Sequence, residues 1–173
     1  MAGATTLPEQ AVILLVEDRP DDVVLVKRAL SMARVTNPLF VVNDGEEAFA
    51  YLDGVGQYAD RLKFPLPQIM LLDLKMPKMD GFEVLRGVRN QPNFRAIRVI
   101  VLTSSEDIFD IQKAYELGAS SFLVKPLDFE DYSSMMRTLS SFWLYANRLH
   151  PVPASPPAIL PATSTSAGST GIP

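Results

Sequence analysis

The sequence predicts an α/β fold with a doubly wound, five-stranded parallel sheet in the order 2-1-3-4-5 and helices on both faces. Five short aliphatic runs alternate with segments whose apolar residues recur every three or four positions. Most of these runs are continuous, which is typical of strands buried on both faces of a parallel sheet. Regular alternation of such strands with helices favours the doubly wound, flavodoxin-like architecture.

The aliphatic runs define the five expected strands. They are Val12–Val16, Phe40–Asn43, Ile69–Leu72, Val99–Leu102 and Phe122–Val124. In this architecture the ligand site lies at the carboxyl ends of the strands, where the strand order reverses. The residues that directly follow each strand are therefore the candidates for chemistry.

Apolar residues at spacings of three and four predict helices between the strands. They are Val23, Val26, Leu30 and Ala33, then Phe82, Leu85 and Val88, then Ile111, Ala114 and Tyr115. Leu117–Gly118 ends the third of these helices, because Gly readily adopts the left-handed conformation found there. We expect Asp21 and Asp22 in the first turn of one helix and Asp80–Gly81 at the start of another.

A last helix is expected from Asp128 to Leu149, and it carries two apolar stripes. The first consists of Phe129, Tyr132, Met136, Leu139 and Trp143, and the second of Met135, Phe142, Tyr145 and Leu149. One stripe can face the core, so the second predicts a partner or homodimer surface. The alternative is that apolar tail residues such as Ile159 and Leu160 cover it.

Length and composition describe one domain with short extensions. The chain has 173 residues, of which 47% are hydrophobic and 21% charged, and this length can bury a full core. We expect an N-terminal extension at residues 1–10, a single domain at 11–149 and a tail at 150–173. Pro, Ser, Thr and Gly dominate residues 151–173, which contain no charged residue. We therefore expect a flexible tail.

Composition also disfavours several functional classes. The chain has no cysteine, which excludes disulfides and thiolate chemistry and suits a reducing compartment. His150 is the one histidine, so a multi-histidine metal site does not fit in the domain. A net charge of −4 without a basic cluster disfavours direct binding of nucleic acid. Met1–Gln10 lacks a positive segment and the first apolar run is short, so we expect a cytoplasmic protein without a membrane span.

Three acids follow two strands that are neighbours in the expected sheet. Glu17 and Asp18 come directly after the first strand, and Asp73 comes directly after the third. Carboxylates gathered in one small site raise each other's pKa, so a cation is needed to neutralise them. Oxygen ligands without His or Cys favour a hard ion, and few ligands with room for water favour Mg²⁺.

Two further strand ends supply a hydroxyl and an ammonium group. The fourth strand ends in Thr103 and Ser104, and the fifth is followed by Lys125. These groups suit transfer of a phosphoryl group onto Asp73, since its charge would be shared among Mg²⁺, Lys125 and the Thr103 hydroxyl. The four strand ends together indicate phosphoryl chemistry, whereas any one acid alone would not.

The motifs VED, LLDLKMPKMDG, LTSS and GASSFLVKP occur in this order along the chain. In these motifs the chain resembles the receiver domains of two-component response regulators, over about Gln10 to Leu149. The segment from Phe64 to Leu85, together with NPLFVVNDGEEAFAYL and a long last helix ending in WLYAN, most resembles single-domain regulators, of which those that serve bacterial phytochrome kinases are the best known. The resemblance implies a stand-alone response regulator that is phosphorylated by a sensor histidine kinase.

The resemblance also implies roles for individual residues. Asp73 would be the phosphoacceptor, and Asp18 and Asp73 would ligate Mg²⁺. Glu17 would act mostly through a bound water, and the backbone carbonyl of Lys75 would complete the metal site. Lys125 would pair with the phosphoryl group.

Further implied roles concern the switch and the lifetime of the phosphoryl group. Thr103 would sense the phosphoryl group. Phe122 occupies the position of the switch tyrosine found in many receivers, so burial of its ring alone would report the switch. Lys75 and Ser105 occupy positions that tune phosphoryl lifetime. Receivers commonly pair through their fourth and fifth strand–helix units, so we expect a homodimer there that uses Met135, Phe142 and Tyr145.

Two other functional classes fit these residues less well. A Mg²⁺-dependent phosphohydrolase with an aspartyl nucleophile would need a second acid two residues after the first, where this chain has Lys75. A pseudo-receiver would only dock partners, which the complete set of acids with Thr103 and Lys125 disfavours. Labelling by a small phosphodonor would separate these classes.

Overall fold

The computed structural model describes residues 11–146. The expected N-terminal extension at 1–10, the tail at 150–173 and the last residues of the final expected helix, with His150, lie outside the described residues. None of the described helices is both long enough and apolar enough to cross a membrane.

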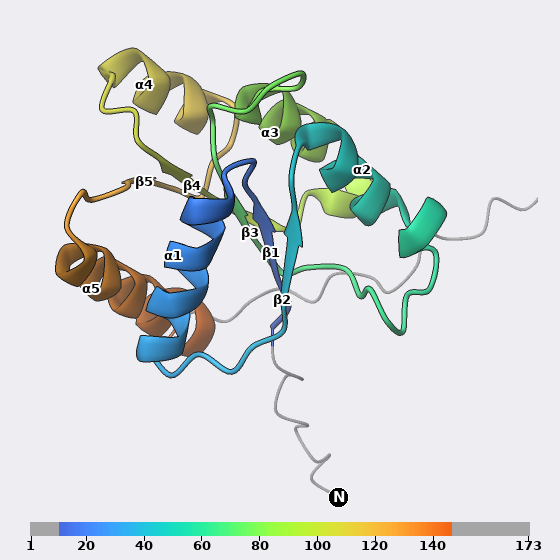
Figure 1. Ribbon diagram of the computed structural model, residues 1–173. Coiled ribbons are helices and arrows are strands. Elements are labelled where there is room, and N and C mark those ends of the chain that lie inside the picture. Colours follow the sequence, from blue (N-terminus) through green and yellow to red (C-terminus); the bar gives the residue numbers. More distant parts are fainter. Residues whose placement is uncertain (1–10, 147–173) are drawn as a thin grey trace, which may run out of the picture.

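Five parallel strands form one sheet in the order β2-β1-β3-β4-β5 (Figure 1). They are β1 (Ile13–Val16), β2 (Leu39–Val42), β3 (Ile69–Leu72), β4 (Arg98–Thr103) and β5 (Ser121–Val124). Each bound agrees with the expected strand to within one residue. The predicted fold class and strand order are therefore confirmed.

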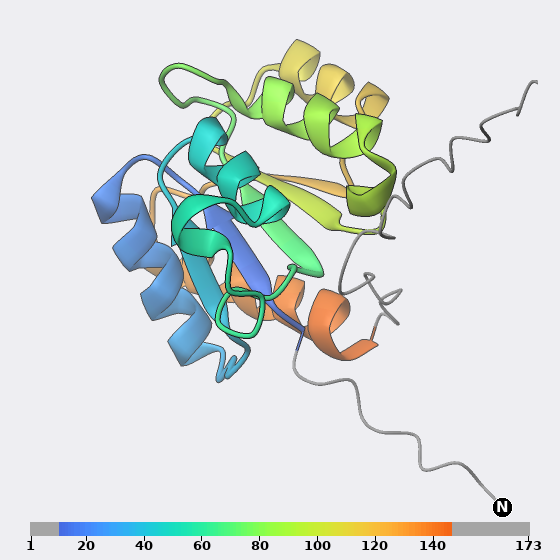
Figure 2. The same ribbon diagram turned by 90° about the vertical axis from the view of Figure 1, so that its right-hand side faces the viewer.

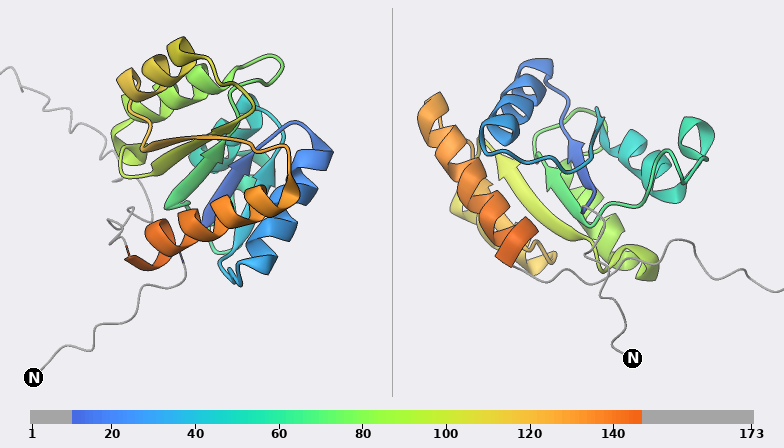
Figure 3. Two further views of the ribbon diagram at one scale, coloured as in Figure 1. Left: turned by 90° about the vertical axis from the view of Figure 1, so that its left-hand side faces the viewer. Right: turned by 90° about the horizontal axis from the view of Figure 1, so that it is seen from below.

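Helices cover both faces of the sheet (Figures 1 and 2). They are α1 (Pro20–Met32), α2 (Gly45–Asp53), α3 (Gly81–Asn90), α4 (Ile108–Glu116) and α5 (Phe129–Ser140), with short 3-10 helices at Gly56–Tyr58 and Pro92–Phe94. Buried residues of α1 and α5 pack together on one face of the sheet, and those of α2, α3 and α4 pack on the other. Figure 3 shows α1 and α5 side by side on their shared face.

The continuous aliphatic strands are explained by these two covered faces. Along β1, Leu14 and Val16 belong to the core beneath α2, α3 and α4, whereas Ile13 and Leu15 belong to the core beneath α1 and α5. Successive side chains of a strand point to opposite faces, so every position of a doubly covered strand must be apolar. The central strands therefore hold the sheet rigid, and their ends can carry polar groups.

The last helix differs from the expected continuous helix over Asp128 to Leu149. After α5 the chain continues as a π-helical segment at Ser141–Ala146. At this junction the Ser140 hydroxyl donates to the Met136 carbonyl at 2.7 Å, and the Ser141 hydroxyl donates to the Arg137 carbonyl at 2.8 Å. Such hydroxyls compete with the backbone for helical carbonyls, which favours a local change of helix type.

The first of the two expected stripes of this helix faces the core, and the second does so only in part. Tyr132, Met136 and Leu139 of the first stripe are buried. Met135 of the second stripe is half-buried and packs against the same core, whereas Phe142 remains 54% exposed. The side chains of Tyr145 and Leu149 lie outside the described residues.

Candidate functional site

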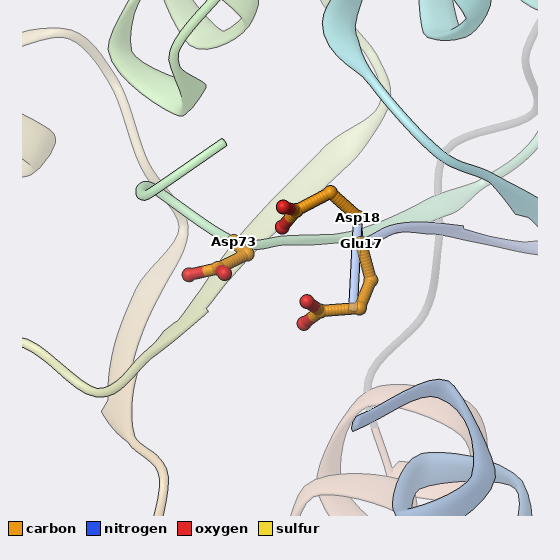
Figure 4. Close-up of side chains that lie close together, drawn as sticks. All are labelled: Glu17, Asp18 and Asp73. Carbon is orange, nitrogen blue, oxygen red and sulfur yellow. The ribbon is translucent and has the colours of Figure 1, made fainter. Parts of the chain in front are cut away.

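The acids expected to form the site meet at the ends of β1 and β3 (Figure 4). These strands pair in register, and the backbone N–H of Asp73 donates to the Val16 carbonyl at 3.1 Å. Glu17, Asp18 and Asp73 each offer an oxygen, and these three oxygens lie within 4.8 Å of one another. The strand register thus brings together acids that are more than fifty residues apart in the sequence.

Burial makes this acidic cluster electrostatically costly. Glu17 is 1% exposed and Asp73 is 5% exposed. Burial raises the pKa of Glu17, and the hydrogen bond and attraction to Lys125 lower it only in part. The negative charge of Asp73 raises this pKa further, so the net shift is upward. A bound cation would relieve this cost.

The ligand atoms of the cluster fit a hard divalent ion. Carboxylate oxygens are the ligands that Mg²⁺ and Mn²⁺ prefer. Oδ1 of Asp18 is buried and has no hydrogen-bond partner among the described residues, so an acceptor oxygen remains available in the cluster. Glu17, Asp18 and Asp73 are therefore the residues that could hold the metal.

Lys125 reaches into the acidic cluster from the end of β5. Its Nζ lies 2.6 Å from Oε2 of Glu17, 2.8 Å from Oδ2 of Asp22 and 3.6 Å from Oδ2 of Asp73. Burial lowers the pKa of Lys125, but hydrogen bonds to Asp22 and Glu17 and the charge of Asp73 outweigh it, so the pKa is raised. The ammonium therefore stays charged beside Asp73.

Asp22 is a site residue that the sequence interpretation missed. It lies in the first turn of α1, as expected, but its carboxylate also binds Lys125. The one sequence signal was its place four residues after Asp18 and five after Glu17. That signal is weak, because acids are favoured in the first turn of any helix.

Thr103 lies at the end of β4, beside the end of β5. Thr103 pairs with Val124 of β5, and the backbone N–H of Lys125 donates to the Thr103 carbonyl at 2.7 Å. The Thr103 side chain is fully buried, and its hydroxyl oxygen accepts a hydrogen bond from the Ser105 N–H at 3.3 Å. The sheet thus places a hydroxyl next to the strand end that carries the ammonium group.

A family model for the response regulator receiver domain matches residues 13–137. The chain belongs to this family. Response regulator Rcp1 of Synechocystis sp. is 38% identical over 133 residues, which are 77% of this chain and 88% of Rcp1. The receiver therefore spans nearly the whole length of a curated relative.

Solved structures of two relatives have the same fold as this receiver. The Mn²⁺-bound form of Rcp1 is 37% identical, with a TM-score of 0.74 over 82% of this chain and 99% of that one. The phosphorylated cyanobacterial phytochrome response regulator RcpA is 34% identical, with a TM-score of 0.77 over 83% of this chain and 100% of that one. An acidic cluster such as Glu17, Asp18 and Asp73 is typical of the receiver metal site.

The loop after β3 holds Asp73 of the receiver in place. The N–H of Lys75 donates to Oδ1 of Asp73 at 3.4 Å, and the N–H of Gly81 donates to the Leu74 carbonyl at 3.0 Å. A Cβ at Gly81 would lie 2.3 Å from the Asp73 carbonyl oxygen, so only glycine fits there. The side chain of Asp80 accepts from the Glu83 N–H at 2.8 Å within a capping box. The expected helix start at Asp80–Gly81 is therefore confirmed.

Phe122 and Ser105 of the receiver contact α4. The N–H of Phe122 donates to the Tyr115 hydroxyl at 3.2 Å, and its half-buried ring packs against the core beneath α2, α3 and α4. The Ser105 hydroxyl donates to Oδ2 of Asp110 at 2.5 Å. The Tyr115 contact was not expected, since no periodicity links a helix surface hydroxyl to a strand N–H. Through these bonds, α4 is tied to both β5 and the end of β4.

Proposed function

We propose that this receiver is a stand-alone response regulator that accepts a phosphoryl group on Asp73, with Mg²⁺, from a sensor histidine kinase. The observation that carries the proposal is the environment of Asp73. Its buried carboxylate adjoins Glu17 and Asp18, and Lys125 lies 3.6 Å from its Oδ2. Transfer of a phosphoryl group requires such positioning and charge stabilisation more than it requires acid–base chemistry.

In the proposed reaction, a carboxylate oxygen of Asp73 forms a bond to phosphorus. The P–N bond of the kinase's phosphohistidine breaks at the same time, and its electron pair returns to the imidazole nitrogen. Glu17, Asp18 and Asp73, with the Lys75 carbonyl, would hold Mg²⁺. When bound, Mg²⁺ neutralises charge that develops on the phosphoryl oxygens.

The chain's own cationic and hydroxyl groups would stabilise the product. The Lys125 ammonium would pair with one phosphoryl oxygen, and the Thr103 hydroxyl would donate a hydrogen bond to another. Movement of Thr103 would open space beside β4 that the ring of Phe122 could fill. Phe122 would then report phosphorylation without a tyrosine hydroxyl.

Labelling with acetyl phosphate in Mg²⁺ tests the proposal. Asp73→Asn should abolish the label without unfolding the protein, because the two side chains are nearly isosteric. Asp53→Asn, an exposed acid at the end of α2, is the matched control and should label like the wild type. No label on the wild type would indicate a docking module, and turnover of many phosphate esters would indicate a phosphohydrolase.

We further propose that the kinase is a bacterial phytochrome and that the phosphoryl transfer takes place in the cytoplasm. RcpA, which shares the fold at 34% identity, is a phytochrome response regulator. The absence of cysteine suits a reducing compartment. Phosphotransfer profiling against the histidine kinases of the source cell, with phytochrome kinases in red and far-red light, would test this partner.

We also propose a homodimer through the fourth and fifth units. A groove of about 440 Å³ runs along α5 beside the edge strand β5, and the exposed Phe142 lines it. Large apolar side chains are also exposed on α4 and on the loop after β5, namely Ile108, Phe109, Tyr115 and Leu127. Large apolar side chains exposed on these elements support an interaction site there. Met135 is half-buried, so only the exposed part of its side chain would contact the second copy.

A further inference from the structure

The Lys125 ammonium is shared unequally among three carboxylates. Hydrogen bonds of 2.6 Å to Glu17 and 2.8 Å to Asp22 use two of its three N–H groups. Its distance to Asp73 is 3.6 Å, which is longer than a hydrogen bond. Asp22 thus draws the ammonium toward α1 and away from the carboxylate that the proposed reaction modifies.

A second buried polar group lies in α5, the helix that follows Lys125. Tyr132 is 3% exposed, and its hydroxyl has no hydrogen-bond partner among the described residues. Helices α1 and α5 pack against each other, and the Arg28 guanidinium of α1 lies 4.3 Å from the centre of the Phe129 ring of α5. A buried hydroxyl without a partner is costly, so a donor at this position is available for a new bond.

Two structural observations point to Asp22 as the acceptor for this hydroxyl: Asp22 binds Lys125, which lies seven residues before Tyr132, and α1 packs on α5. Burial raises the pKa of Tyr132, and the negative charges of Asp22, Glu17 and Asp73 raise it further, with Asp22 having the largest effect of the three. The hydroxyl therefore remains a donor in the physiological range. Of these carboxylates, Asp22 is carried by the helix that packs directly on α5.

We propose that Asp22 is a positioning residue for Lys125 and that the Tyr132 hydroxyl is its alternative donor. In the unphosphorylated protein Asp22 holds the ammonium. When the Lys125 ammonium moves to the phosphoryl group on Asp73, the Tyr132 hydroxyl donates a hydrogen bond to the Asp22 carboxylate that the ammonium has left. The inference rests on the proposed function of Asp73 and adds a connection from the site to α5.

This exchange would preserve the hydrogen bonding of a largely buried carboxylate. Without a second donor, departure of Lys125 would leave Asp22 unpaired, and an unpaired buried charge opposes the phosphorylated state. With Tyr132 as donor, the phosphorylated state gains a charge-assisted hydrogen bond. The position of α5 would then depend on the state of the site.

A double-mutant cycle with beryllium fluoride tests the exchange. Beryllium fluoride, with Mg²⁺, occupies the place of a phosphoryl group on an aspartate, and its affinity can be measured by calorimetry. Tyr132→Phe removes only the hydroxyl and should weaken binding about tenfold in the wild-type background, as expected for loss of one charge-assisted hydrogen bond. In the Asp22→Asn background the same substitution should have little effect.

Asp21→Asn is the matched control for Asp22→Asn. Asp21 is the preceding acid of the same helix turn, but it is exposed and makes no contact with Lys125 in the described structure. Tyr132→Phe should therefore weaken binding about tenfold in the Asp21→Asn background as well. Asp22→Asn alone should bind beryllium fluoride more tightly than Asp21→Asn, because the ammonium is released toward Asp73.

Trp143, the one tryptophan of the chain, provides a second readout in the π-helical segment directly after α5. Its emission should change on beryllium fluoride binding in the wild type and change less in Tyr132→Phe. Equal weakening by Tyr132→Phe in all backgrounds, or no weakening in any, would overturn the inference while leaving the proposed function intact. Failure of the wild type to bind beryllium fluoride would overturn both.

Discussion

At the scale of single residues, the site combines buried acids, whose negative charge is costly away from water, with Lys125, whose positive charge reduces this cost. Burial raises the pKa of Glu17, which means that its ionised form is less stable in the folded protein than in the unfolded chain. The ionised Glu17 therefore destabilises the folded protein at neutral pH, and this destabilisation disappears as the pH falls through the raised pKa. A metal would be bound only when the acids are ionised.

The pH dependence of Mg²⁺ affinity follows from this shift. In titrations between pH 7 and 5, Mg²⁺ affinity should fall by up to about tenfold per pH unit below the raised pKa of Glu17, because this residue is protonated at a higher pH than an ordinary glutamate. Glu17→Gln, which cannot ionise, should bind Mg²⁺ more weakly at pH 7 and show a shallower fall. Calorimetric titrations over this pH range would measure both, and identical slopes would contradict the role of Glu17.

Thr103 is the residue whose hydroxyl should report the phosphoryl group. Thr103→Val keeps the shape of a fully buried side chain but removes one hydrogen bond to a charged group, worth about 1.5–3 kcal/mol. The variant should still be labelled at Asp73 by acetyl phosphate, but the accompanying change in Trp143 emission should be small. Thr103→Ser retains the hydroxyl and should restore the change. An unchanged spectral response in Thr103→Val would exclude this switch.

At the scale of elements, α3 positions the loop that carries Asp73. Its capping box and the close approach of Gly81 to the Asp73 carbonyl hold the start of this helix against the end of β3. Glycine is required there by space, since a Cβ would meet backbone atoms that cannot move independently of the site. The geometry of the candidate phosphoacceptor thus depends on a helix terminus.

Gly81→Ala should therefore affect both stability and phosphorylation. Overpacking against the backbone should cost about 1–3 kcal/mol of unfolding free energy, measured in urea, and should slow labelling by acetyl phosphate. Gly87→Ala is the control, because its Cβ would meet the ring of Phe49 on α2 and not the site. It should lower stability with little effect on labelling. Equal labelling rates in the two variants would argue against this role of α3.

At the scale of the whole molecule, the proposed dimer surface lies on α4, on α5 and on the loop after β5, whereas the acidic cluster lies at the ends of β1 and β3. Signalling would then require that α4, β5 and α5 respond to the state of Asp73. The bonds of Ser105 to Asp110 and of Tyr115 to Phe122, and the proposed exchange between Lys125 and Tyr132, provide two separate connections to those elements. Both connections would bias the same surface.

Phe142→Glu should weaken the proposed dimer of the phosphorylated protein. Burying one Phe side chain contributes about 1.5–3 kcal/mol, so the dimer dissociation constant should rise at least about tenfold. Val55→Glu, at a position that is also 54% exposed but lies on the α2 side, should leave association unchanged. Sedimentation velocity would measure both, with Mg²⁺ affinity as the check on the site. An unaltered association state in Phe142→Glu would refute the dimer.

The sequence by itself determined the fold class, the strands and the clustering of Glu17, Asp18 and Asp73. These depend on local patterns, because aliphatic runs mark buried strands and parallel strands align their carboxyl ends. The roles assigned to these residues and to Thr103, Lys125 and Phe122 stay predictions. Only the tertiary structure decided that Asp22 binds Lys125, that the Tyr132 hydroxyl is buried without a partner among residues 11–146, and that α5 continues as a π-helix. The first two features arise from the packing of α1 with Lys125 and α5, which lie about a hundred positions further along the chain, and no local periodicity encodes such contacts. The third accompanies the hydroxyl bonds of Ser140 and Ser141, which the spacing of apolar residues does not reveal.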